Sequence, residues 1–344
     1  MSKMDLGKQL ANNLADVTLE KCAGIGLENA RRNLPYCERS VLEMPEALDS
    51  FADNSAIVIA AGPSLHRMDA ANKIKQSGYR GMLVATESAM SYCLRNDLVP
   101  DVVVTLDPHA KRIVRFFGDS KLTLEDLEDD DYFQRQDLDP EFARNQLKHN
   151  AELLALINEH GPKMQMAVAT CASDAVVDRC QESGMGLFWW NPFYDDYGAA
   201  NSLTRQVYEL NGLPCINTGG NVGTACWVMA HSILGVEEVA LVGVDLSYHP
   251  DTEYSQTQYY YELIELVGQD RLDEAFIEVE NPHLGQTWYT DPTYYWYREA
   301  FLEMAADAPC TTYNCTEGGI LFGDGIEFIT LDKFIDDRRD RSAR

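Results

Sequence analysis

Apolar strands that alternate with helical segments are the feature that most constrains the fold of this chain. Three short apolar runs, "AIVIAA", "GMLVAT" and "DVVVTLD", are separated by the helical segments "MDAANKIKQSG" and "ESAMSYCLRNDL". Strands that are apolar at nearly every position are buried on both faces, which is typical of a parallel sheet covered by helices. The sequence therefore predicts an α/β fold with a Rossmann-like, open, mostly parallel sheet and helices on both faces.

The alternation extends over most of the chain and predicts one domain, residues 51–335, with additions. It resumes at "MQMAVATC", "GLFWW", "EVALVGVD" and "CTTYNCT". Residues 1–50 are polar with loose helical spacing, which predicts an N-terminal helical appendage. Residues 109–150 are acidic and have no clean period, which predicts an acidic, solvated insertion or a flexible excursion. The aromatic segment 246–300 predicts a lid.

The charge of the chain argues against general nucleic-acid binding. It has 28 Lys and Arg residues against 55 Asp and Glu residues, a formal net charge of −27. Affinity for nucleic acid depends on Lys and Arg neutralising phosphates, so we expect no nucleic-acid partner. An anionic ligand needs local compensation from positive groups, helix N-termini or a metal.

The cysteines and the first residues indicate a cytoplasmic protein. The chain has nine cysteines, an odd number, with no C-x-x-C pair, which fits a reducing compartment. The first segment, "MSKMDLGKQLANNLADVTLE", carries charges where a signal peptide needs an apolar core. Because no run approaches the ~20 apolar residues of a membrane helix, we also expect no membrane span.

Polar and glycine-rich residues follow the expected strands. In an open parallel sheet, ligands bind at the carboxyl ends of the strands, near the point where the strand order reverses. A small, polar rim at this edge suits a nucleotide. The nucleotide-binding candidates that follow strands are Gly62, Pro63, Ser64, Glu87, Asp107, Thr218, Gly219, Gly220, Asn221, Asp245 and Glu317.

Two glycine-rich turns predict cradles for anions. At the Gly62–Ser64 turn, the missing Cβ lets a phosphate approach the backbone, and the following helix offers its positive end. Ser64 either caps that helix or donates to a phosphate oxygen. The Thr218–Asn221 turn precedes an apolar helix and offers a second cradle, although Gly223 alternatively serves packing on the sheet. Neither turn matches the dinucleotide or P-loop motif, so both of those interpretations lose weight.

Carboxylates at strand ends have two interpretations. Asp107 and Asp245 each end an expected strand, where a carboxylate binds a ribose hydroxyl or a divalent cation. The alternative is a helix cap or a salt bridge. Glu87 and Glu317 are similar candidates at other strand ends.

Histidines and tyrosines in the expected loops are candidates for proton transfer and phosphate binding. His109, His249 and His283 are each either a general base or an ordinary surface histidine. Tyr248 and Tyr254 fall in the expected lid, where hydroxyls can bond phosphate and rings exclude water. No Cys/His spacing typical of a metal site and no G-x-S-x-G elbow are present.

Four ordered motifs, "VIAAGPSL", "LVPDVVVTLD", "NTGGNVGTACWVMAHSILGVEEVALVGVDLSY" and "YNCTEGG", carry a resemblance over about residues 55–325. Together they resemble the 6-hydroxymethylpterin diphosphokinase MptE-like family, nearest the branch of Maf-type motility accessory factors linked to flagellin glycosylation. The glycine-turn motifs are also similar to those of bacterial sialyltransferases that use CMP-sialic acid.

The sialyltransferase resemblance implies roles for particular residues. The two turns would hold a cytidine nucleotide together with Asp245, lid tyrosines at Tyr248 or Tyr254 would bind its phosphate, and a histidine after the lid would be the base. His283 is the late candidate for that base, and His249 is the other catalytic candidate.

The resemblance as a whole implies three functions. The first is a glycosyltransferase that moves a nonulosonic acid from a CMP-sugar to a hydroxyl of a glycan or a protein such as flagellin. The second is a pyrophosphokinase that transfers diphosphate from ATP to a hydroxymethyl pterin, with Mg²⁺ held by Asp107, Asp245 or Glu317. The third is a nucleotide-binding accessory protein without catalysis. No cofactor other than this Mg²⁺ is expected.

Overall fold

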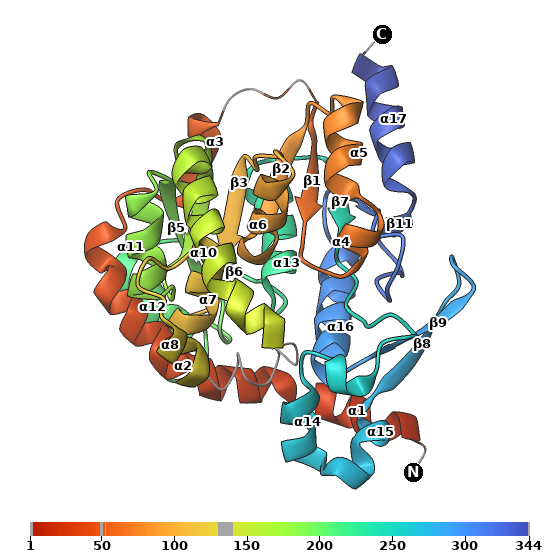
Figure 1. Ribbon diagram of the computed structural model, residues 1–344. Helices are drawn as coiled ribbons and strands as arrows, with labels where there is room; N and C mark the ends of the chain where they lie inside the picture. Colours follow the sequence, from red (N-terminus) through yellow and green to blue (C-terminus); the bar gives the residue numbers. More distant parts are fainter. Residues whose placement is uncertain (1–2, 49–50, 52, 130–139, 343–344) are drawn as a thin grey trace.

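The computed structural model describes residues 3–48, 51, 53–129 and 140–342 (Figure 1). The described strands form a nine-stranded sheet of order β11-β10-β7-β1-β2-β3-β4-β5-β6 and a separate hairpin of β8 and β9. Each pair of neighbouring strands in the large sheet is parallel. The predicted Rossmann-like α/β fold is therefore confirmed.

The strands of the large sheet are short and apolar, as the sequence predicted. Strands β1, β3 and the last four residues of β4 and β7 are buried. Their bounds are β1 (Ser55–Ile59), β2 (Met82–Thr86), β3 (Val102–Thr105), β4 (Gln165–Ala169), β5 (Gly186–Pro192), β6 (Cys215–Ile216), β7 (Glu238–Val242), β10 (Thr311–Asn314) and β11 (Ile326–Phe328).

Helices cover both faces of this sheet. Two apolar clusters lie under the helices of one face, α4 (Ser64–Arg67), α5 (Ala70–Ser77), α6 (Glu87–Arg95), α7 (Ala110–Phe117), α10 (Pro140–His160), α11 (Asp174–Glu182) and α17 (Leu331–Ser342). The opposite face is covered by η2 (Val41–Glu43), α3 (Met44–Ala47), α13 (Val222–Val228) and α16 (Pro292–Ala306). A π-helical turn, η4 (Met229–Ile233), continues α13. Figure 1 shows α5, α6 and α10 in front of the sheet.

The N-terminal helices are attached to the carboxyl edge of the sheet. They are α1 (Lys3–Ala11), α2 (Leu14–Asn33) and the short η1 (Leu34–Tyr36). The buried Asn29 amide donates to the carbonyl oxygens of Pro108 and Cys171, at 3.2 and 2.7 Å. Asn33 donates to those of Thr170 and Ala172, at 2.9 and 2.7 Å. Since these carbonyls follow β3 and β4, α2 supplies donors to backbone groups that the sheet leaves unpaired.

The segment 109–150 is more regular than its composition suggested. It contains α7, α8 (Leu124–Asp129) and the first half of α10, and residues 130–139 lie outside the described part. Phe117, Leu153 and Ile157 from α7 and α10 are buried against α6 and α11. A solvated insertion or flexible excursion therefore does not describe the packed part of α7 and α10. One apolar stripe is enough to bury a helix, and charged residues interrupt that stripe in the sequence.

The aromatic segment forms a small layer with its own core. It comprises η5 (Tyr254–Gln256), α14 (Tyr260–Val267), η6 (Gln269–Arg271), α15 (Leu272–Ala275) and the antiparallel hairpin β8 (Ile277–Asn281) and β9 (Gln286–Thr290). Its buried residues include Tyr248, Phe276 and Tyr289. Helix α1 packs against this layer, because Gly7 lies next to Ala275 and Ile277.

Two further elements belong to the large sheet. The short η3 (Gly161–Lys163) precedes β4, and α12 (Leu203–Asn211) connects β5 to β6.

Two expectations about the environment of the chain can be compared with the described residues. Among these residues, no helix combines the length and apolar character needed to cross a bilayer. Eight cysteines in the described part are free thiols: Cys37, Cys93, Cys171, Cys180, Cys215, Cys226, Cys310 and Cys315. The cytoplasmic location remains a prediction.

Candidate functional site

The order of the strands reverses at β1, which lies between β2 and β7. The chain runs outward from β1 to β6 on one side, and returns to β7 on the other side. In open parallel sheets, this reversal creates a crevice outside the carboxyl ends of the two neighbouring strands. Here the crevice lies between the loop after β1 and the loop after β7, and we call it the switch-point site.

The backbones of these two loops are in close contact. The Gly62 N–H donates to the Gly243 carbonyl oxygen at 2.9 Å. A Cβ at Gly62 would overlap that oxygen and the Asp245 carboxylate, and a Cβ at Gly243 would overlap the Ala60 carbonyl oxygen. Gly243 also has a positive φ of 73°. Both glycines therefore allow the loops to approach, which is a packing requirement as well as a feature of a ligand cradle.

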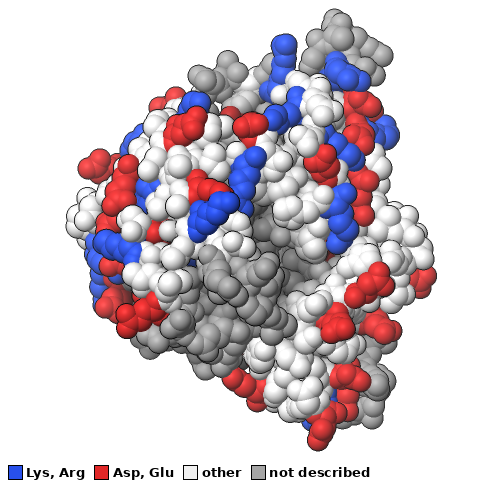
Figure 2. All heavy atoms as spheres, viewed as in Figure 1, with Lys and Arg blue, Asp and Glu red and all other residues white. Residues whose placement is uncertain are grey.

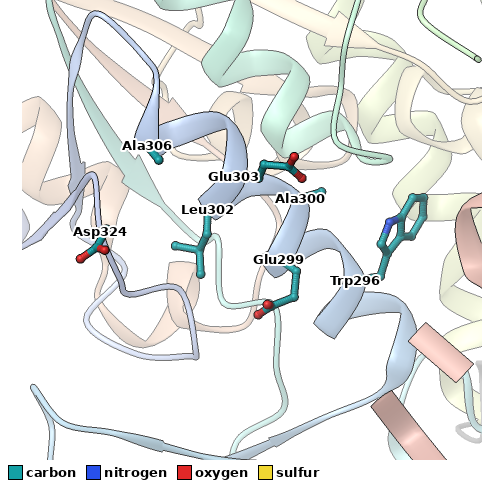
Figure 3. Close-up of a pocket in the computed structure, with 7 residues that line it drawn as sticks. All are labelled: Trp296, Glu299, Ala300, Leu302, Glu303, Ala306 and Asp324. Carbon is teal, nitrogen blue, oxygen red and sulfur yellow. The ribbon is translucent and has the colours of Figure 1, made fainter. Parts of the chain in front are cut away.

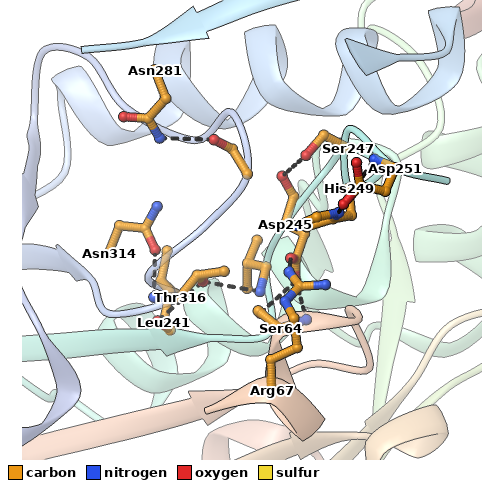
Figure 4. A network of polar contacts seen from close by, with 12 residues as sticks. Ser64, Arg67, Leu241, Asp245, Ser247, His249, Asp251, Asn281, Asn314 and Thr316 are labelled. Carbon is orange, nitrogen blue, oxygen red and sulfur yellow. Dashed lines mark hydrogen bonds and ion pairs between the residues drawn. The ribbon is translucent and has the colours of Figure 1, made fainter. Parts of the chain in front are cut away.

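Ser64 binds a side chain across the site instead of capping a helix. Pro63 is the N-cap of α4, and no side-chain cap is present there. The Ser64 hydroxyl donates to Asp245 Oδ2 at 2.6 Å, and the Ser64 N–H points to the same oxygen at 3.4 Å. Figure 4 shows Ser64, Arg67 and Asp245 pointing toward one another. Of the two interpretations of Ser64, the helix cap does not hold, because Ser64 is the first residue of α4 and Pro63 occupies the N-cap position.

Asp245 is a buried carboxyl with partners. It is 2% exposed, and Arg67 Nη2 lies 3.3 Å from its Oδ1. Burial raises the pKa of Asp245 to about 6, while the Ser64 hydroxyl and the Arg67 guanidinium oppose that rise. The salt bridge that was one interpretation of Asp245 is thus present, and its partner Arg67 was not among the sequence candidates.

The rim of the switch-point site contains His249 and Trp288. The His249 ring meets the Trp288 ring edge to face, with 5.5 Å between centroids, and Arg67 lies 5.8 Å from the centre of the same indole. His249 Nδ1 accepts from the Asp251 N–H at 3.3 Å (Figure 4). His249 is therefore close to Asp245 and Arg67. Trp288, on β9, was not a sequence candidate either.

The loop after β10 closes the other side of the site. Thr316 Oγ1 accepts from the Val244 N–H at 3.2 Å, and the Ile320 N–H donates to the Asp245 carbonyl oxygen at 3.1 Å. Glu317 points away from the site: its carboxylate accepts from the Leu331 N–H at 3.2 Å and lies 3.7 Å from Lys73 Nζ. Its contacts therefore join α5, α17 and the loop after β10.

Glu87 is a buried carboxyl without a full set of partners. It follows β2, is 3% exposed, and its Oε2 has no hydrogen-bond partner among the described residues. Burial raises the pKa of Glu87 to about 8; its own N–H opposes the rise and the Asp107 carboxylate adds to it. At neutral pH its protonated form is therefore favoured, and that form can donate a hydrogen bond.

Asp107 and His109 form a pair at the end of β3. Asp107 Oδ1 accepts from the His109 N–H and lies 2.8 Å from His109 Nδ1. Strands β1 and β2 lie between β3 and β7, and three strand spacings of about 4.8 Å put the ends of β3 and β7 about 14 Å apart. Asp107 and Asp245 are thus too far apart to bind one metal ion, and the described residues contain no cluster of three or more His, Cys, Asp or Glu side chains suited to a metal.

The Thr218–Asn221 turn meets the end of β1 through α13. The Asn221 side chain caps α13 by accepting from the Thr224 N–H at 2.9 Å. A Cβ at Gly223 would lie 3.8 Å from the Ala60 Cβ, so the helix begins beside the Gly62 loop. Gly219 and Gly220 have positive φ values of 54° and 85° and pack under α16, where a Cβ at Gly220 would overlap Trp296. The two glycine-rich turns are therefore neighbours, but α16 covers the second.

An open pocket lies along α16, beside the contact of this helix with Gly219 and Gly220 (Figure 3). Its volume is about 550 Å³, and none of the sequence candidates lines it. Its lining residues are Trp296, Glu299, Ala300, Leu302, Glu303, Ala306 and Asp324. Three of these are carboxylates, so the pocket does not suit an anionic ligand.

The predicted lid tyrosines are packed within the aromatic layer. The Tyr248 hydroxyl donates to Asp291 Oδ2 at 2.6 Å and accepts from the Gln258 N–H at 3.2 Å. The Tyr254 ring stacks on Phe276 with 4.1 Å between centroids. Burial and the nearby Asp273 and Glu278 carboxylates raise the pKa of Tyr254. In this conformation neither hydroxyl faces the switch-point site.

His283 lies at the turn of the β8–β9 hairpin, whereas His249 contacts the hairpin at Trp288 of β9. The His283 ring stacks on Phe328 of β11, with 4.6 Å between ring centroids. The structure therefore brings together Gly62, Ser64, Asp245 and His249, and it separates His283 from them.

The open parallel sheet with glycine-lined loops at its switch point defines a Rossmann-like α/β protein, a class that places ligands at this edge. Residues 28–125 match the family model described as 6-hydroxymethylpterin diphosphokinase MptE-like, and the predicted resemblance to that family is confirmed over this range. No curated protein matches the chain.

One similar solved structure is titled "Structure of MAf glycosyltransferase from Magnetospirillum magneticum AMB-1". It is 15% identical, the alignment covers 86% of this chain, and the TM-score is 0.48. The present chain spans 37% of the length of that chain.

Proposed function

We propose that this chain is a nucleotide-dependent transferase whose donor binds at the switch-point site. The observation that carries the proposal is the meeting of the Gly62–Ser64 loop, the beginning of α13 and the Ser64–Asp245–Arg67 network at the carboxyl edge of β1 and β7. This edge is where α/β proteins of this class bind nucleotides. The order of the glycine-turn motifs and the family match over residues 28–125 support the same ligand class.

The specific reaction that we propose is transfer of a nonulosonic acid from a CMP-sugar to a hydroxyl group. The acceptor oxygen attacks the anomeric carbon, the bond from that carbon to the phosphate oxygen breaks, and CMP leaves with the electron pair. A base takes the acceptor proton. His249 is the better placed of the two histidines, and the acceptor is a glycan or a protein such as flagellin.

A second candidate is the pyrophosphokinase named in the family description. It requires Mg²⁺ on the ATP phosphates, and Mg²⁺ sites of this kind use one or two carboxylates together with the phosphates. Because Asp107 and Asp245 lie at separated strand ends, only one of them would hold the ion in this reaction. A non-catalytic nucleotide-binding accessory protein is the third candidate.

A thermal-shift titration separates the three candidates. CMP, CTP, ATP and GDP are each added with and without Mg²⁺, since a ligand that binds the folded state raises its melting temperature. We expect CMP to raise the melting temperature by a few degrees without metal. The Asp245→Asn variant should lose this shift, whereas Asp97→Asn, which changes an exposed carboxylate paired with Lys75, should keep it.

Other outcomes decide against the glycosyltransferase. Stabilisation by ATP only when Mg²⁺ is present supports the pyrophosphokinase and contradicts our proposal. If CMP binds, the hydrolysis and transfer of a CMP-nonulosonate are then measured with flagellin and glycan acceptors. Binding without turnover on either acceptor supports the accessory protein.

A further inference from the structure

An unpartnered buried donor lies at the rim of the switch-point site. Trp288 is 3% exposed, and its indole N–H has no hydrogen-bond partner among the described residues. An indole nitrogen is a donor only, so an acceptor must come from water or a ligand. Buried donors usually have an acceptor. The indole N–H groups of Trp189 and Trp190 in the core also have no partner among the described residues, but Trp288 differs from them because it lies beside a partly exposed guanidinium.

Arg67 brings several more donors to the same place. Its guanidinium lies 5.8 Å from the centre of the Trp288 ring, and its side chain is 40% exposed. A guanidinium has five N–H donors, and Arg67 uses one nitrogen, Nη2, for Asp245 Oδ1. The remaining donors have no partner within the described part of the chain. Arg67 can thus bind a second acceptor without leaving this position.

Gly318, in the loop after β10, lies beside both side chains. A Cβ at Gly318 would lie 3.2 Å from Trp288, closer than an ordinary contact, and 3.6 Å from Arg67 Nη2. The His249 ring also packs against Trp288, edge to face. His249 Nδ1 lies 3.3 Å from the Asp251 nitrogen and 3.5 Å from its carboxylate, so this ring nitrogen is already engaged within its own loop.

The charge of the chain makes this concentration of donors informative. The formal net charge is −27, so an anionic ligand needs local positive groups. On the face in Figure 2, the described Lys and Arg side chains are interspersed with Asp and Glu, and they form no broad basic area. The tyrosines first considered for phosphate binding, Tyr248 and Tyr254, are engaged within the aromatic layer.

We propose that Arg67 and Trp288 form a subsite for the anionic group of the ligand, a phosphate or a carboxylate. The proposal rests on the proposed function, because a CMP-nonulosonate carries both of these groups. Asp245 holds Arg67 in place in the free protein, and the ligand anion shares the guanidinium with it. Arg67 is then the binding residue, and Asp245 and Ser64 position it.

Binding to a matched set of probes tests the subsite. Calorimetry with the full chain measures CMP, cytidine, N-acetylneuraminate and inorganic pyrophosphate at one salt concentration. Arg67→Ala removes the guanidinium, Arg67→Lys keeps its charge, and Trp288→Phe removes the indole N–H together with the five-membered ring that carries it. Arg95→Ala is the control, because this exposed arginine in the last turn of α6 removes the same charge away from the site.

We expect Arg67→Ala to weaken the binding of an anionic probe by about 10- to 100-fold, as for loss of a hydrogen bond to a charged group. Arg67→Lys should restore part of it, Trp288→Phe should weaken it less, and Arg95→Ala should leave it unchanged. A loss for CMP with no loss for cytidine identifies the phosphate. A loss for N-acetylneuraminate with CMP unchanged identifies the carboxylate.

The outcomes for the subsite and for the proposed function are distinguishable. If the wild type binds pyrophosphate but not CMP, and Arg67→Ala abolishes that binding, the subsite is supported and the CMP-dependent function fails. If CMP binds equally well to the wild type and Arg67→Ala, and N-acetylneuraminate does too, the subsite is refuted while the function stands. Failure of the wild type to bind any anionic probe also refutes the subsite.

Discussion

Glu87 and Asp245 are two carboxyls at the same edge of the same sheet, and they differ in their partners. They are 3% and 2% exposed, so burial alone does not separate them. Asp245 receives the Ser64 hydroxyl and the Arg67 guanidinium, whereas one oxygen of Glu87 has no partner in the described residues. Burial raises the pKa of Asp245 to about 6 and that of Glu87 to about 8. The comparison shows how donors, at equal depth, help a carboxyl to keep its charge.

The largest change that we expect comes from breaking the contact that places Asp245. In Gly62→Ala, the new methyl group overlaps the Gly243 carbonyl oxygen and the Asp245 carboxylate, so one of the two loops must move. We expect a loss of about 3 kcal/mol or more in the free energy of unfolding. Urea unfolding followed by circular dichroism measures it. Gly78→Ala is a poor control because of its positive φ; Gly24→Ala, with open space around it, is suitable. Gly24→Ala, inside α2, should leave stability unchanged or raise it, and the absence of any loss for Gly62→Ala would contradict the packing argument.

The next prediction concerns Glu87 and the dependence of stability on pH. Its pKa rises from an ordinary value of 4.5 to about 8 in the folded chain, so the folded state binds a proton that the unfolded state releases between these values. The contribution of Glu87 to stability is therefore full below about pH 4.5 and is lost as pH rises through 8. As the pH rises from 5 to 9, we expect the free energy of unfolding of Glu87→Gln to increase relative to that of the wild type, by on the order of 3 kcal/mol.

The measurement is urea unfolding of both proteins across this pH range. Only the difference between the two is informative, because Asp245 and Asp291 also have raised pKa values. Glu262→Gln, on the exposed side of α14, is the control. Parallel pH profiles for Glu87→Gln and the wild type would mean that Glu87 does not retain its proton.

The smallest effect removes one partner from Asp245. Ser64→Ala deletes the hydroxyl that donates to Oδ2 at 2.6 Å, and the carboxylate loses part of its stabilisation. We expect the free energy of unfolding to fall by about 1–3 kcal/mol at pH 7.5. The fall should be smaller at pH 5, where more of Asp245 is protonated. The exposed Ser232→Ala is the control. An equal loss at both pH values would indicate that the hydroxyl serves packing only.

The sequence predicted the large sheet well because its strands are local apolar runs. The segment "GMLVAT" became β2 and "DVVVTLD" became β3, each within two residues. The partner of Ser64 could not be predicted in this way, since Asp245 reaches it only when β7 pairs with β1. Likewise, the sequence could not show that the Tyr248 hydroxyl donates a hydrogen bond to Asp291, the cap of α16, because the two residues are 43 positions apart.

Trp288 was missed although a signal for its strand was present. In "FIEVENPHLGQTWYT", a run of alternating apolar and polar residues precedes a turn that contains Pro282 and Gly285, and a second β-prone run follows it. This pattern indicates a hairpin. The aromatic residues of this segment instead favoured the interpretation of a lid. Arg67 carried no signal of its own, because a single arginine after a glycine-rich turn has no specific meaning until the opposite loop is known.

The return of the chain to β1 has a consequence for folding during synthesis. Strand β1 pairs with β2 early in the chain, but its other edge is taken by β7, whose first residue Glu238 lies opposite Ser55. A nascent chain therefore emerges from the ribosome with an apolar central strand exposed along one edge for most of its translation. Exposed edges of this kind invite pairing with other chains, and non-local pairing is slow. The switch-point site is thus assembled late, and a chain truncated before β7 is expected to aggregate.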